Sequence, residues 1–156
     1  MIRYRAVLAA GAVFLSAALA ATLFINHKPH VNPSQVLTWD CEYPTYKPET
    51  IMIYCGDGGA YISKIHWSSW SQDGARGTGE YYRNLCEPDC ADGEIVHAPV
   101  NVALSNITPR KGKFYLRTLD MRSVSGKDFP WGESSNFELD VMEFAEQMNW
   151  DDNANR

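Results

Sequence analysis

Residues 6–25 form an apolar run without a single charged side chain, and this run limits what the chain can fold into more than any other feature. Arg3 and Arg5 precede it, and only Ser16 and Thr22 interrupt it. Twenty residues of α-helix span about 30 Å, the thickness of the hydrocarbon core of a bilayer. The sequence therefore predicts that this segment crosses a membrane and that residues 26–156 fold in an oxidising, extracytoplasmic compartment.

Two interpretations of residues 1–25 are open. A cleaved signal peptide needs a basic start, an apolar stretch of about 7–15 residues and a small-x-small cleavage site. Ala18-Leu19-Ala20 supplies such a site. An uncleaved anchor uses the whole run and keeps Arg3 and Arg5 on the cytoplasmic side. The length of the run favours a single-pass anchor in the cytoplasmic membrane, with secretion after cleavage as the alternative.

The chain has four cysteines, an even number that predicts two disulfides in an exported domain. Three pairings are possible. We favour Cys41 with Cys55 and Cys86 with Cys90, because each pair brackets a turn-rich segment that contains proline. A loop of about 15 residues closed by the first bridge contributes roughly 3 kcal/mol of stability on the chain-entropy model. A four-thiolate zinc site is the less favoured alternative in an exported protein.

Charge is unevenly distributed along the sequence. Residues 26–127 carry equal numbers of acidic and basic side chains, whereas residues 128–156 carry eight acidic residues and one arginine. Phosphate binding needs a cationic face, so nucleic acid is not an expected partner. The acidic end is typical of a solvated helix face.

Alternation of apolar and polar residues with a period of two dominates the chain after residue 49. Every second residue from Val96 to Leu104 is apolar, which is the pattern of a half-buried strand. Asp57-Gly58 and Asp73-Gly74 are tight-turn signals between such segments. The pattern predicts strands over residues 50–55, 60–71, 75–83, 96–104 and 113–124.

These strands favour an all-β domain over residues 50–127, built as a small antiparallel β-sandwich, with a partly open barrel as the alternative. Residues 26–49 contain four prolines and are expected to form an extended linker ahead of that domain.

A different periodicity ends the chain. Phe137, Val141, Phe144 and Met148 recur at helical spacing, and Ser135 stands three residues before a glutamate, as in a capping box. We therefore expect an amphipathic helix over residues 136–149, within an acidic C-terminal segment that spans residues 128–156.

Aromatic side chains supply the first candidate binding site. Trp67 and Trp70 are three residues apart, so a regular strand would turn them to opposite faces and leave at most one in the core. Core and edge packing explains both rings most simply. The functional interpretation pairs an exposed Trp70 with Tyr82 as a stacking platform for a sugar, a peptide or a lipid headgroup.

Catalytic and metal-binding signals are weaker. Asp89, Asp92 and Glu94 crowd one loop and are weak candidates for a Ca²⁺ site, although their spacing does not match an EF-hand. Asp57 and His66 are the residues that a hydrolase or transferase would use, yet the place of Asp57 before a glycine is explained by a turn. No nucleophile-elbow, zinc-protease or phosphate-loop motif occurs. We therefore expect a protein that is not an enzyme and binds no cofactor.

The order of several short motifs resembles that of a family of small exported actinobacterial proteins whose function is uncharacterised. The resemblance covers residues 51–119 and implies export and a disulfide-linked β domain, but it carries over no catalytic residue. The matching motifs are Cys55-Gly-Asp-Gly, Trp67-x-x-Trp70, Ala75-x-Gly77-x-Gly79, Cys86-x-Pro88-x-Cys90-Ala91 and Pro99-Val100-x-Val102-x-Leu104. The expected function is non-enzymatic binding or scaffolding at the cell envelope, with an envelope component or protein as partner and the membrane reached through the N-terminal helix.

Overall fold

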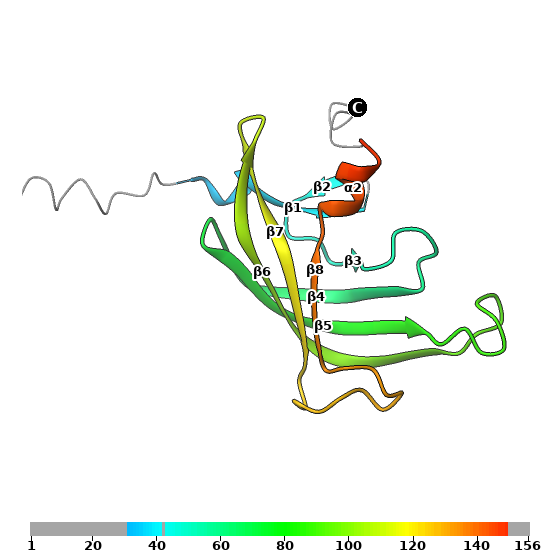
Figure 1. Ribbon diagram of the computed structural model, residues 1–156. Helices are drawn as coiled ribbons and strands as arrows, with labels where there is room; N and C mark the ends of the chain where they lie inside the picture. Colours follow the sequence, from blue (N-terminus) through cyan, green and yellow to red (C-terminus); the bar gives the residue numbers. More distant parts are fainter. Residues whose placement is uncertain (1–30, 42, 150–156) are drawn as a thin grey trace, which may run out of the picture. The chain divides into compact units, whose positions relative to one another are not determined.

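The computed structural model describes residues 31–41 and 43–149, which belong to one compact unit that begins at Val31. The fold is mostly β (Figure 1). A 3₁₀ turn, η1 (Pro33–Gln35), comes first, and α2 (Glu143–Gln147) comes last. The strands are β1 (Val36–Asp40), β2 (Tyr43–Thr45), β3 (Ile51–Met52), β4 (Ala60–Ser71), β5 (Gly74–Asn84), β6 (Ile95–Arg110), β7 (Lys113–Ser123) and β8 (Asn136–Asp140).

No helix within the described residues is long and apolar enough to cross a membrane. The apolar run at residues 6–25, on which the predictions of an anchor and of a signal peptide rest, lies outside those residues.

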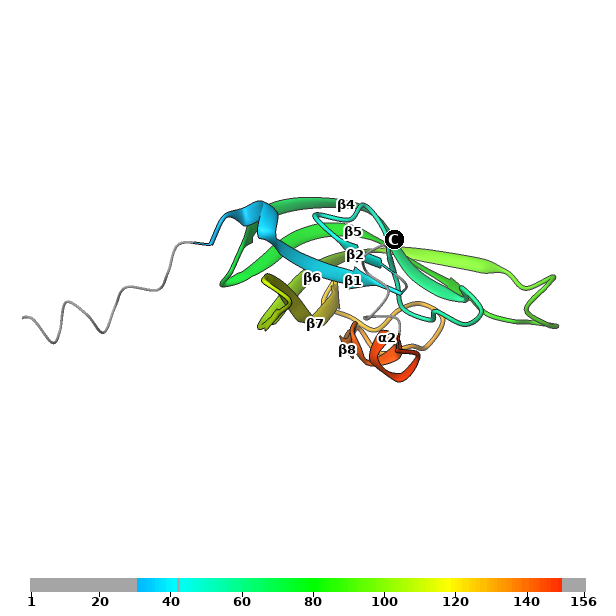
Figure 2. The same cartoon turned by 90° about the horizontal axis from the view of Figure 1, so that it is seen from above.

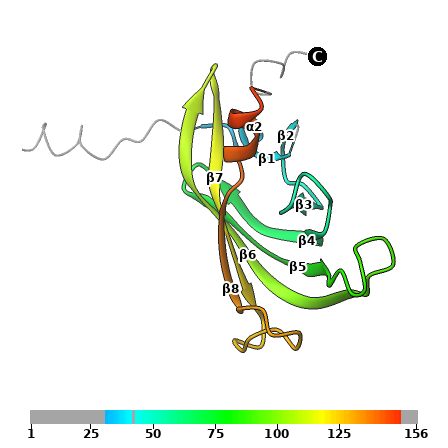
Figure 3. The ribbon, with the colours of Figure 1, turned by 45° about the vertical axis from the view of Figure 1, so that its right-hand side comes forward.

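All strands belong to one mixed sheet in the order β2-β1-β7-β6-β5-β4-β3. The remaining strand, β8, pairs with the C-terminal part of β7, from Thr118 to Arg122. The sheet curls into a half-barrel (Figure 3). This arrangement corrects the predicted sandwich and agrees better with the alternative of a partly open barrel, because the core is enclosed by the curl of a single sheet and not by two sheets. Strands as long as β6 and β7 twist strongly along their length, which favours curling. The sheet is also not purely antiparallel, since Val36 and Leu37 pair in parallel with Phe114 and Tyr115.

The two ends of the curled sheet are fastened to each other. Cys41 follows β1 and forms a disulfide with Cys55, which follows β3 at the other end of the strand order. One residue earlier, the carboxylate of Asp40 accepts a hydrogen bond of 3.0 Å from the backbone N–H of Met52 in β3. The favoured pairing of Cys41 with Cys55 is thus present, and so is that of Cys86 with Cys90.

The segment expected to be a linker contributes β1 and β2 to this sheet. Trp39 of β1 is 1% exposed and Val36 is fully buried, so part of the core comes from this proline-containing segment. The predicted start of the β domain at residue 50 is therefore corrected to lie before β1. The prolines permit this, because Pro33 lies in η1, Pro44 in the short strand β2 and Pro48 in a loop, so none interrupts β1.

The C-terminal segment also differs from the expectation. Asn136–Asp140 is strand β8, and the helix is confined to Glu143–Gln147. Phe137 and Val141 fit a helical spacing, but together with Leu139 they also fit a period of two, and the edge of β7 offers backbone partners to a strand. The short helix is docked: Ala145 is buried, Phe144 is half-buried, and the guanidinium of Arg117 pairs with both Asp140 and Glu146.

Candidate functional site

A polar hollow of about 640 Å³ lies on the face of the sheet that is turned away from the core. Side chains from β4, β5, β6 and β7 line it, so it depends on the assembled sheet and not on one loop. These four strands lie side by side in the view of Figure 2. The lining residues that matter for its chemistry are His66, Arg76, Thr78, Asn101, Asp120 and Arg122.

Strand register gathers these residues. Thr78 lies opposite Asn101, which lies opposite Arg122 on the next strand, and Arg76 and Asp120 flank Ala103 in the same way. Side chains alternate between the two faces of a strand. The row Thr78–Asn101–Arg122 and the row Arg76–Ala103–Asp120 are two residues apart on each strand, so their side chains point to the same face of the sheet. The core face takes the residues between them, such as Val102 and Met121, which are 2% and 1% exposed.

Gly77 allows β4 and β5 to approach closely beside the hollow. A Cβ atom built on this glycine would lie 2.7 Å from the carbonyl oxygen of His66, which is too close for any other residue. The neighbouring strand makes this approach, so Gly77 serves the packing of β4 against β5.

Within the described residues, one cation of the hollow has no ion-pair partner and a second is partly neutralised. Arg122 binds Asp120 in a fork, with its Nε and Nη2 atoms 2.9 and 3.1 Å from the two carboxylate oxygens, and this contact raises the pKa of Arg122. The guanidinium of Arg76 is exposed and has no hydrogen bond or ion pair within residues 31–41 and 43–149. Hydroxyl and amide groups of Thr78 and Asn101 lie in the same hollow. The arrangement suits a ligand with an anionic group and several hydroxyl groups.

An aromatic row extends the polar face beyond Thr78. The rings of Tyr61 and Tyr82 stack at 4.9 Å with an interplanar angle of 7°, and His97 stacks on the other side of Tyr82 at 5.4 Å. The Tyr82 hydroxyl donates a hydrogen bond to Glu80, which also binds the Lys64 ammonium at 2.8 Å. Hydrogen bonds from Lys64 and Tyr82 lower the pKa of Glu80, and the same contact with Glu80 raises the pKa of Lys64.

The predicted platform of Trp70 with Tyr82 does not form. Trp70 is 7% exposed and donates its indole N–H to the carbonyl oxygen of Val36, so it belongs to the core. Trp67 is half-buried, and its ring lies 4.9 Å from that of Trp70, edge to face. The register shift between Trp67 and Ser69 in β4 turns both rings to the same side, which a regular strand would not do. The aromatic neighbours of Tyr82 are Tyr61 and His97.

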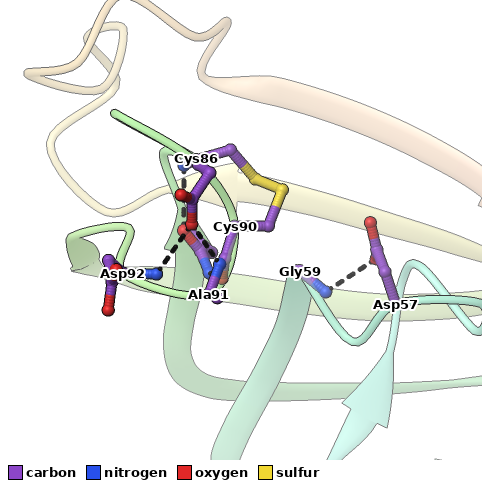
Figure 4. The surroundings of a disulfide bond; sticks show 8 residues. Asp57, Gly59, Cys86, Cys90, Ala91 and Asp92 are labelled. Carbon is purple, nitrogen blue, oxygen red and sulfur yellow. Dashed lines mark hydrogen bonds between the residues drawn. A yellow bond between two sulfur atoms is a disulfide. The ribbon is translucent and has the colours of Figure 1, made fainter.

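The residues proposed for catalysis lie apart from each other. His66 lines the polar hollow, whereas Asp57 lies in a second hollow beside Tyr54 and Phe144. The carboxylate of Asp57 accepts a hydrogen bond of 2.8 Å from the backbone N–H of Gly59, as a turn residue does (Figure 4). The structure therefore does not join the two residues into one site.

The acidic loop near the second disulfide is organised by its own backbone. Asp89 accepts hydrogen bonds from the backbone N–H groups of Ala91 and Asp92. Figure 4 shows Ala91 and Asp92 next to the Cys86–Cys90 bridge. Asp89, Asp92 and Glu94 do not come together as possible metal ligands, and no group of three such side chains does so anywhere in the described part of the chain.

Two features of the molecule were missed at the sequence level. Arg76 and Arg122 are far apart in sequence, and only the alternation of their strands hinted at a shared polar face. The loop after β7 was also missed: Glu133 accepts hydrogen bonds from the hydroxyl of Tyr81 and the indole of Trp131. Burial and the Glu133 carboxylate raise the pKa of Tyr81.

Comparison of the chain with models of known families, with curated proteins and with solved structures found no match.

Proposed function

We propose that this protein is a non-catalytic binding module of the cell envelope, and that the polar hollow captures an anionic, hydroxyl-rich ligand. The observation that carries the proposal is the exposed guanidinium of Arg76, which has no ion-pair partner in the part of the chain that the structure describes. The two disulfides are compatible with an extracytoplasmic protein.

The chemistry of the hollow favours an acidic polysaccharide or a polyol phosphate over a neutral glycan. Arg76 offers a planar set of donors that matches a carboxylate or phosphate, and Arg122 keeps donors that its fork with Asp120 does not use. Thr78 and Asn101 offer hydrogen bonds to sugar hydroxyls. The aromatic row of Tyr61, Tyr82 and His97 lies on the same face and lengthens the surface available to a polymer.

Binding is favoured over catalysis because the hollow lacks the pairing that a catalytic base needs. His66 has no hydrogen-bonded carboxylate or hydroxyl partner within the described residues. Ser68, the nearest hydroxyl along the strand, donates instead to the backbone carbonyl of Arg76.

Isothermal titration of the full chain in detergent tests this function. The probes are polygalacturonate, poly(glycerol phosphate) and, as the neutral comparison, dextran. We expect binding to at least one anionic polymer and none to dextran. Arg76→Gln removes the anion-binding fork while keeping a polar side chain, and it should weaken binding about tenfold or more.

Arg83→Gln is the matched control. Arg83 lies over the ring of Tyr54, with 4.9 Å between its guanidinium carbon and the ring centre, and it does not line the hollow. The control should bind as the wild type does. Equal losses in the two variants, or no binding to either anionic polymer, would contradict the proposed function.

A further inference from the structure

A second hollow continues the polar hollow toward the turn between β4 and β5. Its volume is about 280 Å³. Arg76, Ala103 and Ser105 line both hollows, so the two adjoin at these residues. We call the joined space the polar trough. Its existence means that the ligand site extends beyond the hollow described above, on the side away from Thr78.

The strand β5 runs along the polar trough. Gly74 lines the second hollow, Thr78 lines the first, and Arg76 stands midway between them on the strand. At about 3.3 Å per residue, the distance from Gly74 to Thr78 is roughly 13 Å. Because β5 lies between β4 and β6 (Figure 1), side chains of both neighbours border this path. The polar trough is therefore longer than a single sugar ring.

Polar groups lie on both sides of Arg76 along this path. Thr78 and Asn101 are in the first hollow. In the second hollow, Ser69 lies opposite Arg76 on β4, and Ser105 lies on the same face of β6 as Asn101, four residues further on. Both serines are exposed, and their hydroxyl groups have no hydrogen-bond partner within residues 31–41 and 43–149. A chain of sugars would thus meet hydrogen-bonding groups before and after the guanidinium.

The charges of the polar trough admit one anionic group rather than many. Arg122 is balanced by Asp120, which lies 2.9 Å from its Nε atom. Asp73 adds a carboxylate at the turn end, and Glu138 is exposed beside Asp120 on β8. Arg76 is therefore the lining arginine whose charge no carboxylate balances within the described residues. A ligand with a carboxylate on every unit would bring several of them close to these acidic groups.

From this arrangement we propose that the ligand is a linear polysaccharide in which single carboxylate-bearing units alternate with neutral units, laid along β5 with one carboxylate on Arg76. The inference rests on the proposed function and names the ligand of the same site. The planar guanidinium matches one carboxylate with two hydrogen bonds. The neutral unit on one side of that carboxylate meets Ser69 and Ser105. The neutral unit on the other side meets Thr78 and Asn101.

Isothermal titration of the full chain in detergent with oligosaccharides of defined length tests the proposal. The first probe is the hyaluronan hexasaccharide, in which glucuronate alternates with N-acetylglucosamine. The others are hexagalacturonate, which carries a carboxylate on every unit, and glucuronate alone. We expect the hyaluronan hexasaccharide to bind roughly tenfold more tightly than either, because only it adds hydrogen bonds on both sides of Arg76 without bringing further carboxylates next to that arginine's acidic neighbours.

A pair of serine substitutions tests the second hollow. Ser69→Ala combined with Ser105→Ala should weaken the hyaluronan hexasaccharide about fivefold more than it weakens glucuronate, because a single ring on Arg76 does not extend to both serines. The matched control is Ser134→Ala. Ser134 is an exposed loop serine that lines neither hollow, so the control should bind both probes as the wild type does.

A third variant tests the charge argument. Asp120→Asn releases the guanidinium of Arg122 from its fork and gives the polar trough a second unbalanced cation. It should tighten the binding of hexagalacturonate about fivefold, and it should change the binding of the hyaluronan hexasaccharide less. The preference for alternating charge would then narrow. An unchanged preference in this variant would contradict the charge argument and the proposal with it.

The outcomes separate this proposal from the proposed function. Equal affinities of the wild type for the hyaluronan hexasaccharide and hexagalacturonate would overturn the alternating ligand while leaving anion capture intact. Equal affinities for the hexasaccharide and glucuronate would do the same, because they would exclude a contribution from the second hollow. Absence of binding to every anionic probe would contradict the proposed function itself, and the alternating ligand would fall with it.

Discussion

Tyr81 and Tyr82 are neighbours in sequence but serve opposite faces of the same sheet. Tyr81 is 1% exposed, packs against Phe129 and Trp131, and donates its hydroxyl to Glu133. Tyr82 stands in the row with Tyr61 and His97 on the polar face and donates to Glu80. The comparison teaches that side chains on the core face hold the half-barrel together, whereas those on the polar face remain in contact with solvent.

The largest expected effect tests the core face. Trp39 is 1% exposed and packs on Tyr115 at 5.9 Å between ring centres. Trp39→Ala leaves a cavity that the curled sheet cannot fill, and it should lower the free energy of unfolding by about 3–5 kcal/mol in urea denaturation. A loss below about 1 kcal/mol would mean that β1 is not part of the cooperative core.

The two disulfides should differ in a second test. Cys41–Cys55 joins the ends of the sheet across 14 residues, whereas Cys86–Cys90 spans four residues of a loop. Replacing both cysteines of the first bridge by serine should cost about 3 kcal/mol, and the same change at the second bridge should cost less, because the closed loop is shorter. Chemical denaturation of the two variants measures the difference, and the reverse order would contradict it.

Tyr81 and Tyr82 themselves give a matched pair of smaller changes. Tyr81→Phe removes a hydrogen bond to the carboxylate of Glu133 and should cost about 1.5 kcal/mol of stability. Tyr82→Phe loses a hydroxyl bonded to Glu80 on the solvated face and should stay within about 0.5 kcal/mol of the wild type. Equal losses of stability in the two variants, measured by thermal or urea unfolding, would contradict the distinction between the two faces.

The smallest effect concerns pH. Burial raises the pKa of Asp40, and the hydrogen bond from Met52 opposes that rise only in part. A folded-state pKa above the unfolded value favours folding at low pH, and this contribution is lost as pH rises through the folded pKa. Asp40→Asn keeps an oxygen acceptor for Met52 and removes the buried charge, so it should unfold at a slightly higher temperature than the wild type at pH 7. At pH 3 the two should agree, and lower stability of the variant at pH 7 would contradict this account.

Sequence patterns predicted the middle of the molecule well. The strands from residue 60 to residue 123 follow from alternation and from the Asp-Gly turns, and both disulfides follow from the loops that they bracket. Alternation also accounts for the two faces of β5, with Ala75 and Tyr81 on the core face and Arg76 and Tyr82 on the other. These features depend on short-range geometry, which alternation records directly.

The two segments that lie toward the ends of the described chain were misassigned for a shared reason. β1 follows a proline-containing stretch and β8 carries a pattern compatible with a helix, yet both pair with β7. Neither segment contains its own partner, so its local sequence does not fix its structure. In β4, the register shift between Trp67 and Ser69 places Trp67 and Trp70 on the same side, and no residue-level rule marks that shift.

The sequence by itself determined which residues alternate, where the chain turns and which cysteines can close short loops. Only the tertiary structure decided that one sheet curls on itself, that Arg76, Asn101 and Arg122 share a hollow, and that β1 lies beside β7. Those outcomes depend on which strand lies beside which. Strand order is set by the combined burial of the whole core and not by any single segment.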